Sequence, residues 1–267
     1  LVASNCGGNL IPVKLELGGK GAAVIFDDVD IDDAAEKLVG AITFHTGQVC
    51  CDATRWLIQR DIYDDFINVA VQRLKAVKIG HQMDDGTQMG PVVSEVQRNR
   101  VLGYLETSVA DGAETLLEGG AEEVSGHNGH YVKPALLAGS LDNVAAREEI
   151  FGPVVVASPF DDIDEVIAKG NDTEYGLAAS VWTRDINKAH KVAKGLKAGT
   201  VGTSLTYTLP ITDGTAGDAL ITNGSGTLSF TTISGGGSST LAALTDTTIS
   251  GVTLPSEMDI VRTKTTP

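Results

Sequence analysis

Short apolar runs alternate with amphipathic stretches of helical period between about residues 15 and 201, and this alternation constrains the fold more than any other feature. The first pair is an apolar run at residues 22–26 and a helical pattern that reaches Ile42, with Asp30 or Asp32 as the expected N-cap. Repeated alternation of strand and helix predicts an α/β fold with a mostly parallel sheet flanked by helices. Further strands are predicted at residues 56–58, 154–156 and 180–182, and further helices over residues 62–77, 94–109, 163–167 and 185–196.

The charge and composition of the chain restrict its partners and its setting. A net charge of -15 argues against nucleic-acid binding and against docking on anionic lipid, because both attract clustered Lys and Arg. No run reaches the roughly 18 consecutive apolar residues of a membrane span, so no membrane partner is expected. The 3 cysteines, two of them adjacent, do not form a disulfide framework, and reduced thiols favour a cytoplasmic protein.

The composition changes abruptly after Gly202. Residues 203–256 lack Lys and Arg and consist mainly of Thr, Ser, Gly and small apolar residues, a composition that is β-prone or disordered. We therefore predict two domains, an α/β region over residues 1–202 and a Thr/Ser/Gly-rich appendage over residues 203–267. The appendage weakly resembles modules of phage tail fibres and related virion proteins, which implies a structural or adhesion role as the alternative function.

Two short segments contain residues that can carry covalent chemistry. Cys50 follows a Gly-Gln turn, and a thiol can act as a nucleophile where its surroundings favour the thiolate. Glu16 offers a carboxylate that can accept a proton. The structural alternatives are a small core Cys and a surface Glu. Cys51 makes a redox dithiol a further alternative, but two adjacent thiols without other ligands are a poor zinc site, and no metal site is predicted.

Several segments share one order along the chain. Together they resemble the successive signatures of the aldehyde dehydrogenase superfamily, and the resemblance covers about residues 3–201. It implies a catalytic-domain fragment with the α/β fold predicted above. The segments are LELGGK at residues 15–20, GQVCC at residues 47–51, EEIFGP at residues 148–153 and YGLAA at residues 175–179.

The resemblance implies a role for four residues. Cys50 matches the catalytic nucleophile, and Glu16 matches the general base that activates the hydrolytic water. Glu149 matches the residue that binds the nicotinamide-side ribose, and Phe151 lies beside the nicotinamide. The implied reaction is the oxidation of a small aldehyde to a carboxylic acid through a thiohemiacetal and a thioester, with NAD or NADP as the cofactor.

Departures from the family pattern qualify this interpretation. The family has a dinucleotide-binding domain before the LELGGK segment. It also has a later strand that is used in assembling homo-oligomers. We expect both to be missing here, and we therefore expect the activity of this chain alone to be incomplete. Asp52 stands where Ala or Gly is usual, and its charge is expected to raise the pKa of the Cys50 thiol. His45 either assists the thiolate or is structural.

Overall fold

The computed structural model describes residues 1–204, 218–222 and 228–232. These residues belong to two compact units, which are described separately. The smaller one contributes an antiparallel hairpin of β10 (Asp218–Thr222) and β11 (Leu228–Thr232). The hairpin agrees with the β-prone composition. Residues 203 and 204 of the predicted appendage belong to β9 of the larger unit, and, apart from the hairpin, its other residues lie outside the described residues. The predicted boundary between residues 202 and 203 stays a prediction.

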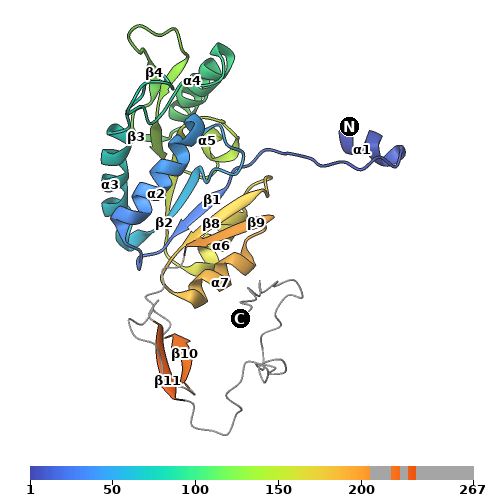
Figure 1. Ribbon diagram of the computed structural model, residues 1–267, viewed down its shortest axis with the longest axis vertical. Coiled ribbons are helices and arrows are strands. Elements are labelled where there is room, and N and C mark those ends of the chain that lie inside the picture. The colour runs from blue at the N-terminus through green and yellow to red at the C-terminus, as the bar shows by residue number, and fades with distance from the viewer. Residues whose placement is uncertain (205–217, 223–227, 233–267) are drawn as a thin grey trace, which may run out of the picture. The chain divides into compact units, whose positions relative to one another are not determined.

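A seven-stranded sheet forms the centre of the larger unit, in the order β3-β6-β7-β2-β1-β8-β9. Figure 1 shows β2, β1, β8 and β9 of this sheet side by side. All neighbouring pairs are parallel except β3 and β6, which confirms the mostly parallel sheet expected from the sequence. A separate antiparallel pair is formed by β4 (Gly120–Glu122) and β5 (Tyr131–Lys133). The strands of the large sheet are β1 (Ala22–Ile25), β2 (Arg55–Gln59), β3 (Glu114–Leu117), β6 (Ala135–Ala138), β7 (Val154–Phe160), β8 (Ala178–Trp182) and β9 (Thr200–Ser204).

The helices begin where short polar side chains can cap them. Asp30, rather than Asp32, caps α2 by accepting a hydrogen bond from the Asp33 N–H, and Ser94 caps α4 in the same way. The third helix ends at Lys75, short of the predicted residue 77. The helices are α1 (Val2–Gly8), α2 (Ile31–Thr43), α3 (Tyr63–Lys75), α4 (Glu95–Ala110), α5 (Val144–Arg147), α6 (Ile163–Asn171) and α7 (Ile186–Gly195), with 3-10 turns η1 (Phe44–Gly47) and η2 (Arg60–Ile62).

Both faces of the sheet are covered, because alternate residues of a strand point to opposite sides. Ala23 and Ile25 of β1 belong to a core cluster with buried residues of α2 and α3. Ala22 and Val24 belong to a second cluster with Val166 of α6 and buried residues of α7. Strand β1 is therefore apolar throughout, as the sequence pattern indicated. None of the described helices is long and apolar enough to cross a membrane.

The segments that carry the sequence motifs all precede parallel strands. Residues 18–21 lead into β1, residues 47–54 into β2, residues 148–153 into β7 and residues 175–177 into β8. Since parallel strands begin at the same edge of a sheet, these segments meet at the amino ends of the strands. By contrast, α1 has no buried residue and residues 9–17 are exposed.

Candidate active site

Gly19 lies between Glu149 and the backbone of Cys50. Its N–H donates a hydrogen bond of 2.8 Å to Glu149 Oε1. A Cβ at this position would lie 2.1 Å from the Cys50 carbonyl oxygen, and a Cβ on Gly18 would lie 2.6 Å from Glu149 Oε2 and 3.1 Å from a ring carbon of Tyr175. Only glycines allow this approach, so the LELGGK, GQVCC and EEIFGP segments come into contact through the glycine pair.

Helix α4 holds the segment that contains Glu149 and Phe151. Arg100 Nη2 donates to the Glu149 carbonyl at 2.8 Å. Gln97 Nε2 donates to the carbonyls of Ile150 at 3.0 Å and of Phe151 at 2.7 Å. Phe151 adopts a left-handed backbone, with φ of 60°, and its ring remains 36% exposed. The segment is thus fixed through its carbonyl groups while an aromatic side chain stays accessible.

The loop before Cys50 is strained. His45 and Thr46 have φ values of 50° and 59°, in the left-handed region that β-branched residues such as Thr avoid. Residues held in such regions cost about 1–3 kcal/mol each, and they cluster at functional sites. The Thr46 hydroxyl donates to the Gly90 carbonyl at 3.0 Å. Gly47 has φ of 67°, and a Cβ there would lie 2.4 Å from the Gly152 carbonyl carbon, so this loop packs against the segment after Phe151.

Gln48 fixes the other end of this turn. Its Nε2 donates to the His45 carbonyl at 3.0 Å, and its Oε1 accepts the Val93 N–H at 2.9 Å. His45 therefore contributes to the turn through its carbonyl, while its side chain is exposed. Beyond Gln48 the Cys50 side chain is half-buried and the Cys51 side chain is exposed. The turn presents both sulfurs near the surface without enclosing them in the core.

Asp52 is an unusual carboxylate in this loop. Burial raises its pKa to about 7. Its Oδ2 is buried and has no hydrogen-bond partner among the described residues. The pKa of the Cys51 thiol is raised, first by burial and then by the neighbouring Cys50 and Asp52. The expected effect of Asp52 on the Cys50 thiol stays a prediction.

Glu16 lies apart from these contacts. Its side chain is 71% exposed and forms an ion pair of 2.8 Å with Lys14. Within residues 1–204, no hydrogen bond or ion pair joins Glu16 to Cys50 or Glu149. The structure thus brings together the segments of Cys50, Glu149 and Phe151, and it does not bring Glu16 to them. The role of Glu16 as a general base stays a prediction.

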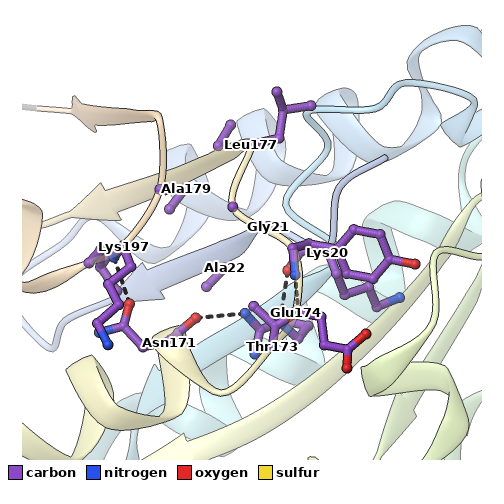
Figure 2. A pocket seen from close by; sticks show the side chains of 16 residues that line it. Lys20, Gly21, Ala22, Asn171, Thr173, Glu174, Leu177, Ala179 and Lys197 are labelled. Atoms are coloured by element: carbon purple, nitrogen blue, oxygen red, sulfur yellow. Dashed lines mark hydrogen bonds between the residues drawn. The ribbon is translucent and has the colours of Figure 1, made fainter. Parts of the chain in front are cut away.

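Lys20, the residue after Gly19, lines a cavity of about 230 Å³. Arg55, Asn171 and Lys197 are among the other lining residues (Figure 2). The Lys20 side chain is only 2% exposed. Burial, and then the nearby Arg55, lower the pKa of Lys20 to about 7. Arg55 itself is held by carbonyl groups, with Nε donating to the Lys20 carbonyl at 2.9 Å and Nη2 to the Gly170 carbonyl at 2.8 Å.

No sequence motif predicts a role for Lys20 or Arg55. One sequence feature could have indicated that they are buried: each is a cationic residue close before the apolar part of a strand that is buried on both faces. Arg55 is buried against the carbonyls of Lys169 and Gly170 in α6, which follow more than a hundred residues later and which no local pattern indicates.

A model of the aldehyde dehydrogenase family matches residues 1–212. A betaine aldehyde dehydrogenase of Rhizobium johnstonii is 43% identical over 201 residues, which are 75% of this chain and 41% of that protein. An aldehyde dehydrogenase of Deinococcus radiodurans is 43% identical over 216 residues, which are 79% of this chain and 42% of that protein. The solved structure of a betaine aldehyde dehydrogenase from Staphylococcus aureus in complex with NAD+ has a TM-score of 0.72 at 36% identity, covering 78% of this chain and 41% of that chain.

The chain spans about 41% of the length of the curated relatives it matches. The family match ends at residue 212, and the tail-fibre resemblance of residues 203–256 has no support from these relatives and stays a prediction. Since the match includes the LELGGK, GQVCC and EEIFGP segments that meet at Gly19, and since it covers most of the sequence, the chain belongs to the aldehyde dehydrogenase family.

Proposed function

We propose that this chain carries out the cysteine-dependent steps of NAD(P)-linked oxidation of an aldehyde to a carboxylic acid. The observation that carries the proposal is the position of Gly19, which hydrogen-bonds Glu149 and packs against the Cys50 carbonyl. It joins the segment of the proposed nucleophile to the segment of the proposed cofactor ligand. The names of the relatives, which are aldehyde dehydrogenases, support the same reaction class.

The proposed reaction begins at the Cys50 sulfur. The thiolate attacks the carbonyl carbon of the aldehyde, a carbon–sulfur bond forms, and the carbonyl electron pair moves onto oxygen. The turn held by Gln48 limits the positions of the sulfur, and such positioning lowers the entropic part of the barrier. A bound nicotinamide cofactor would supply the acceptor for the hydride that leaves the reacting carbon. Cys50 then holds the acyl group as a thioester.

Hydrolysis of the thioester needs a base near the sulfur. We assign this role to Glu16, which takes a proton from the water that attacks the acyl carbon; the carbon–sulfur bond breaks and the Cys50 thiolate is restored. General-base assistance of this kind contributes typically about 10²–10⁴-fold. Glu16 lies in an exposed segment, so the assignment requires this segment to approach Cys50 in the working protein.

Glu149 and Phe151 fit the nicotinamide side of the cofactor. Glu149 uses Oε1 to accept the Gly19 N–H, and its Oε2 has no hydrogen-bond partner among the described residues and can accept from a ribose hydroxyl. The exposed Phe151 ring offers an apolar surface two residues later. Both NAD and NADP carry this ribose, so the proposal covers either cofactor. A solved relative from Staphylococcus aureus is in complex with NAD+.

The setting and partners in this proposal follow from charge and cysteine chemistry. Three free thiols favour a reducing cytoplasm, and a net charge of -15 disfavours nucleic acid and anionic membranes as partners. The proposed partner is a small aldehyde.

Hydrolysis of p-nitrophenyl acetate tests the nucleophile. Transfer of the acetyl group to a thiol, and hydrolysis of the resulting thioester, need no nicotinamide. We expect mass spectrometry to find an acetyl group on the Cys50 sulfur, and we expect turnover to be lost in Cys50→Ser. The adjacent Cys51→Ser is the matched control and should keep the activity. Equal turnover in Cys50→Ser and the wild type would exclude Cys50 as the nucleophile.

The base is tested in the same assay by following the acetylated protein. Glu16→Gln should form the acetyl-enzyme normally and hydrolyse it roughly 10²-fold more slowly, or slower still. Glu106→Gln, an exposed carboxylate on α4, is the control. Normal hydrolysis in Glu16→Gln would reject Glu16 while leaving the proposal for Cys50 intact. Reduction of NAD+ by added aldehyde, followed by nicotinamide absorbance, tests the complete reaction.

A further inference from the structure

His81, Asp84 and His127 form a cluster outside the segments described above. His81 and Asp84 lie in the turn after α3, and His127 lies in the loop between β4 and β5. The two imidazole rings are stacked, with centroids 4.2 Å apart and planes at 14°. Asp84 Oδ2 lies 3.4 Å from His127 Nε2, and Asp84 Oδ1 lies 3.9 Å from His81 Nδ1. One ligand atom from each residue lies within 4.8 Å of the others.

These distances are close to those of a metal site. A tetrahedral zinc ion with bonds of roughly 2.0–2.1 Å keeps its ligand atoms roughly 3.3 Å apart. The Asp84–His127 separation of 3.4 Å already has this value, and the other separations require small movements of surface loops. The side chains of His81, Asp84 and His127 are 29%, 55% and 32% exposed, so an ion can reach them from solvent.

The backbone around the cluster is already organised. The Asp84 N–H donates to the His81 carbonyl at 2.9 Å, and the His127 N–H donates to the Val124 carbonyl at 3.1 Å. The Met83 N–H donates a long hydrogen bond of 3.4 Å to His81 Nδ1. A metal ion bound at Nδ1 would replace this weak contact. Backbone hydrogen bonds therefore order both turns, so that small movements would bring the three ligand atoms to metal-site distances.

We propose that His81, Asp84 and His127 bind a first-row divalent cation, with Zn²⁺ as the best match. Two imidazoles and one carboxylate suit Zn²⁺, whereas Mg²⁺ and Ca²⁺ prefer sites made of oxygen alone. The fourth position would hold water. Because the histidines come from distant parts of the sequence, the ion would link the turn after α3 to the β4–β5 loop and raise the melting temperature.

The competing interpretation is a carboxylate that forms ion pairs with protonated imidazoles, without any metal. Only the metal site should bind added divalent cations. Co²⁺ is the useful probe, because Co²⁺ bound to thiolates gives an intense charge-transfer absorption that a His/Asp site lacks. It therefore separates this cluster from the thiols of Cys6, Cys50 and Cys51.

The experiment measures Co²⁺ and Zn²⁺ binding to the full chain by calorimetry, together with the Co²⁺ absorption spectrum. We expect one ion per chain without thiolate charge transfer, and a rise in melting temperature on adding Zn²⁺. His127→Gln and Asp84→Asn should each weaken binding at least about 10-fold, since loss of even an outer partner of a ligand costs this much. His190→Gln, on the exposed surface of α7, should bind as the wild type does.

Three outcomes would overturn the proposal: no saturable binding by the wild type, equal binding by His127→Gln and the wild type, or a Co²⁺ spectrum dominated by thiolate. Asp84 is exposed and His127 is half-buried, and both lie on loops. We therefore expect substitutions at these positions to leave the fold intact. Melting temperatures without metal, measured for each variant, verify this directly.

Discussion

The Gly19 N–H donates to Glu149 Oε1 at 2.8 Å, although the two residues are 130 positions apart. Gly19 precedes β1 and Glu149 precedes β7, and β2 lies between these strands in the sheet. The bond therefore spans the start of β2, where the Cys50 loop is placed. This explains why the Cys50 carbonyl packs against Gly19, at a distance that leaves no room for a side chain.

Gly19→Ala should disturb the Cys50 loop. The added Cβ would lie 2.1 Å from the Cys50 carbonyl oxygen, so either this loop or the start of β1 must move. Overpacking of this kind costs typically about 1–3 kcal/mol of stability. A displacement of about 1 Å can lower a reaction rate about 10²-fold. Thermal unfolding and p-nitrophenyl acetate hydrolysis measure the two effects.

Gly40→Ala is the matched control for this prediction. Gly40 lies within α2, and a Cβ there meets nothing within 4 Å. Ala is favoured over Gly inside helices by about 1 kcal/mol, so this variant should be at least as stable as the wild type. If Gly19→Ala behaved like Gly40→Ala in both assays, the close approach of Gly19 to Cys50 would be absent in solution.

Glu149→Gln should weaken NAD+ binding while preserving the loop. The amide oxygen of Gln can still accept the Gly19 N–H, so the contact between the segments is retained. The negative charge is lost, and hydrogen bonds to charged groups contribute about 1.5–3 kcal/mol against about 1 kcal/mol for neutral ones. We therefore expect a several-fold to about 10-fold higher dissociation constant in a fluorescence titration.

Glu148→Gln provides the comparison, because this exposed neighbour also loses one charge. Its affinity for NAD+ should stay close to that of the wild type. Ester hydrolysis should be unchanged in both variants, since the acyl steps need no cofactor. Equal affinities for NAD+ in Glu149→Gln and Glu148→Gln would assign the cofactor contact to another group.

The sequence predicted the central strands and their helices because the responsible signals are local. Residues 22–26 are apolar throughout, as a strand buried on both faces requires, and Asp30 is a typical N-cap. The part between residues 111 and 150 was not predicted. Its strands are three or four residues long, and β3 is half exposed, so neither length nor alternation distinguishes them from loops.

The motif resemblance selected Cys50, Glu149 and Phe151, and the structure brings their segments together. The reason for this convergence could not be predicted, because it depends on the order of strands in the sheet, which no single segment contains. The His81 and His127 pair was missed for the same reason: the two residues lie far apart in the sequence and match no ligand spacing. Glu16 has a motif but no tertiary partner among residues 1–204.

Asp52→Asn should stabilise the protein at neutral and alkaline pH. In the folded protein Asp52 holds its proton up to a pKa of about 7, whereas in the unfolded chain it loses the proton near 3.8. The folded state therefore binds more protons between these values, and the free energy of unfolding falls as pH rises through this window. Asn does not ionise, so the variant should gain about 1–2 kcal/mol above pH 7, after allowance for partial exposure.

The difference should vanish below about pH 3, where Asp52 is uncharged in both the folded and the unfolded chain. Urea unfolding followed by the fluorescence of Trp56 and Trp182, the 2 tryptophans of the chain, measures it in the α/β unit. Asp61→Asn, an exposed carboxylate, should show no such dependence. A gain that is the same at pH 4 and pH 8 would contradict an ionisable, buried Asp52.

Lys20→Met should reveal the opposite dependence on pH. In the folded protein Lys20 loses its proton at a pKa of about 7, and in the unfolded chain it keeps the proton to about 10.5. The unfolded state binds more protons in this window, so the contribution of Lys20 to the free energy of unfolding rises with pH between the two values and is lost as pH falls through 7. The Met side chain has a similar length and no charge. The gain of the variant over the wild type in the free energy of unfolding should therefore be largest at pH 6 and smallest at pH 10. The exposed Lys37→Met should change stability equally at both pH values, and the same behaviour in Lys20→Met would mean that the Lys20 amine reaches solvent.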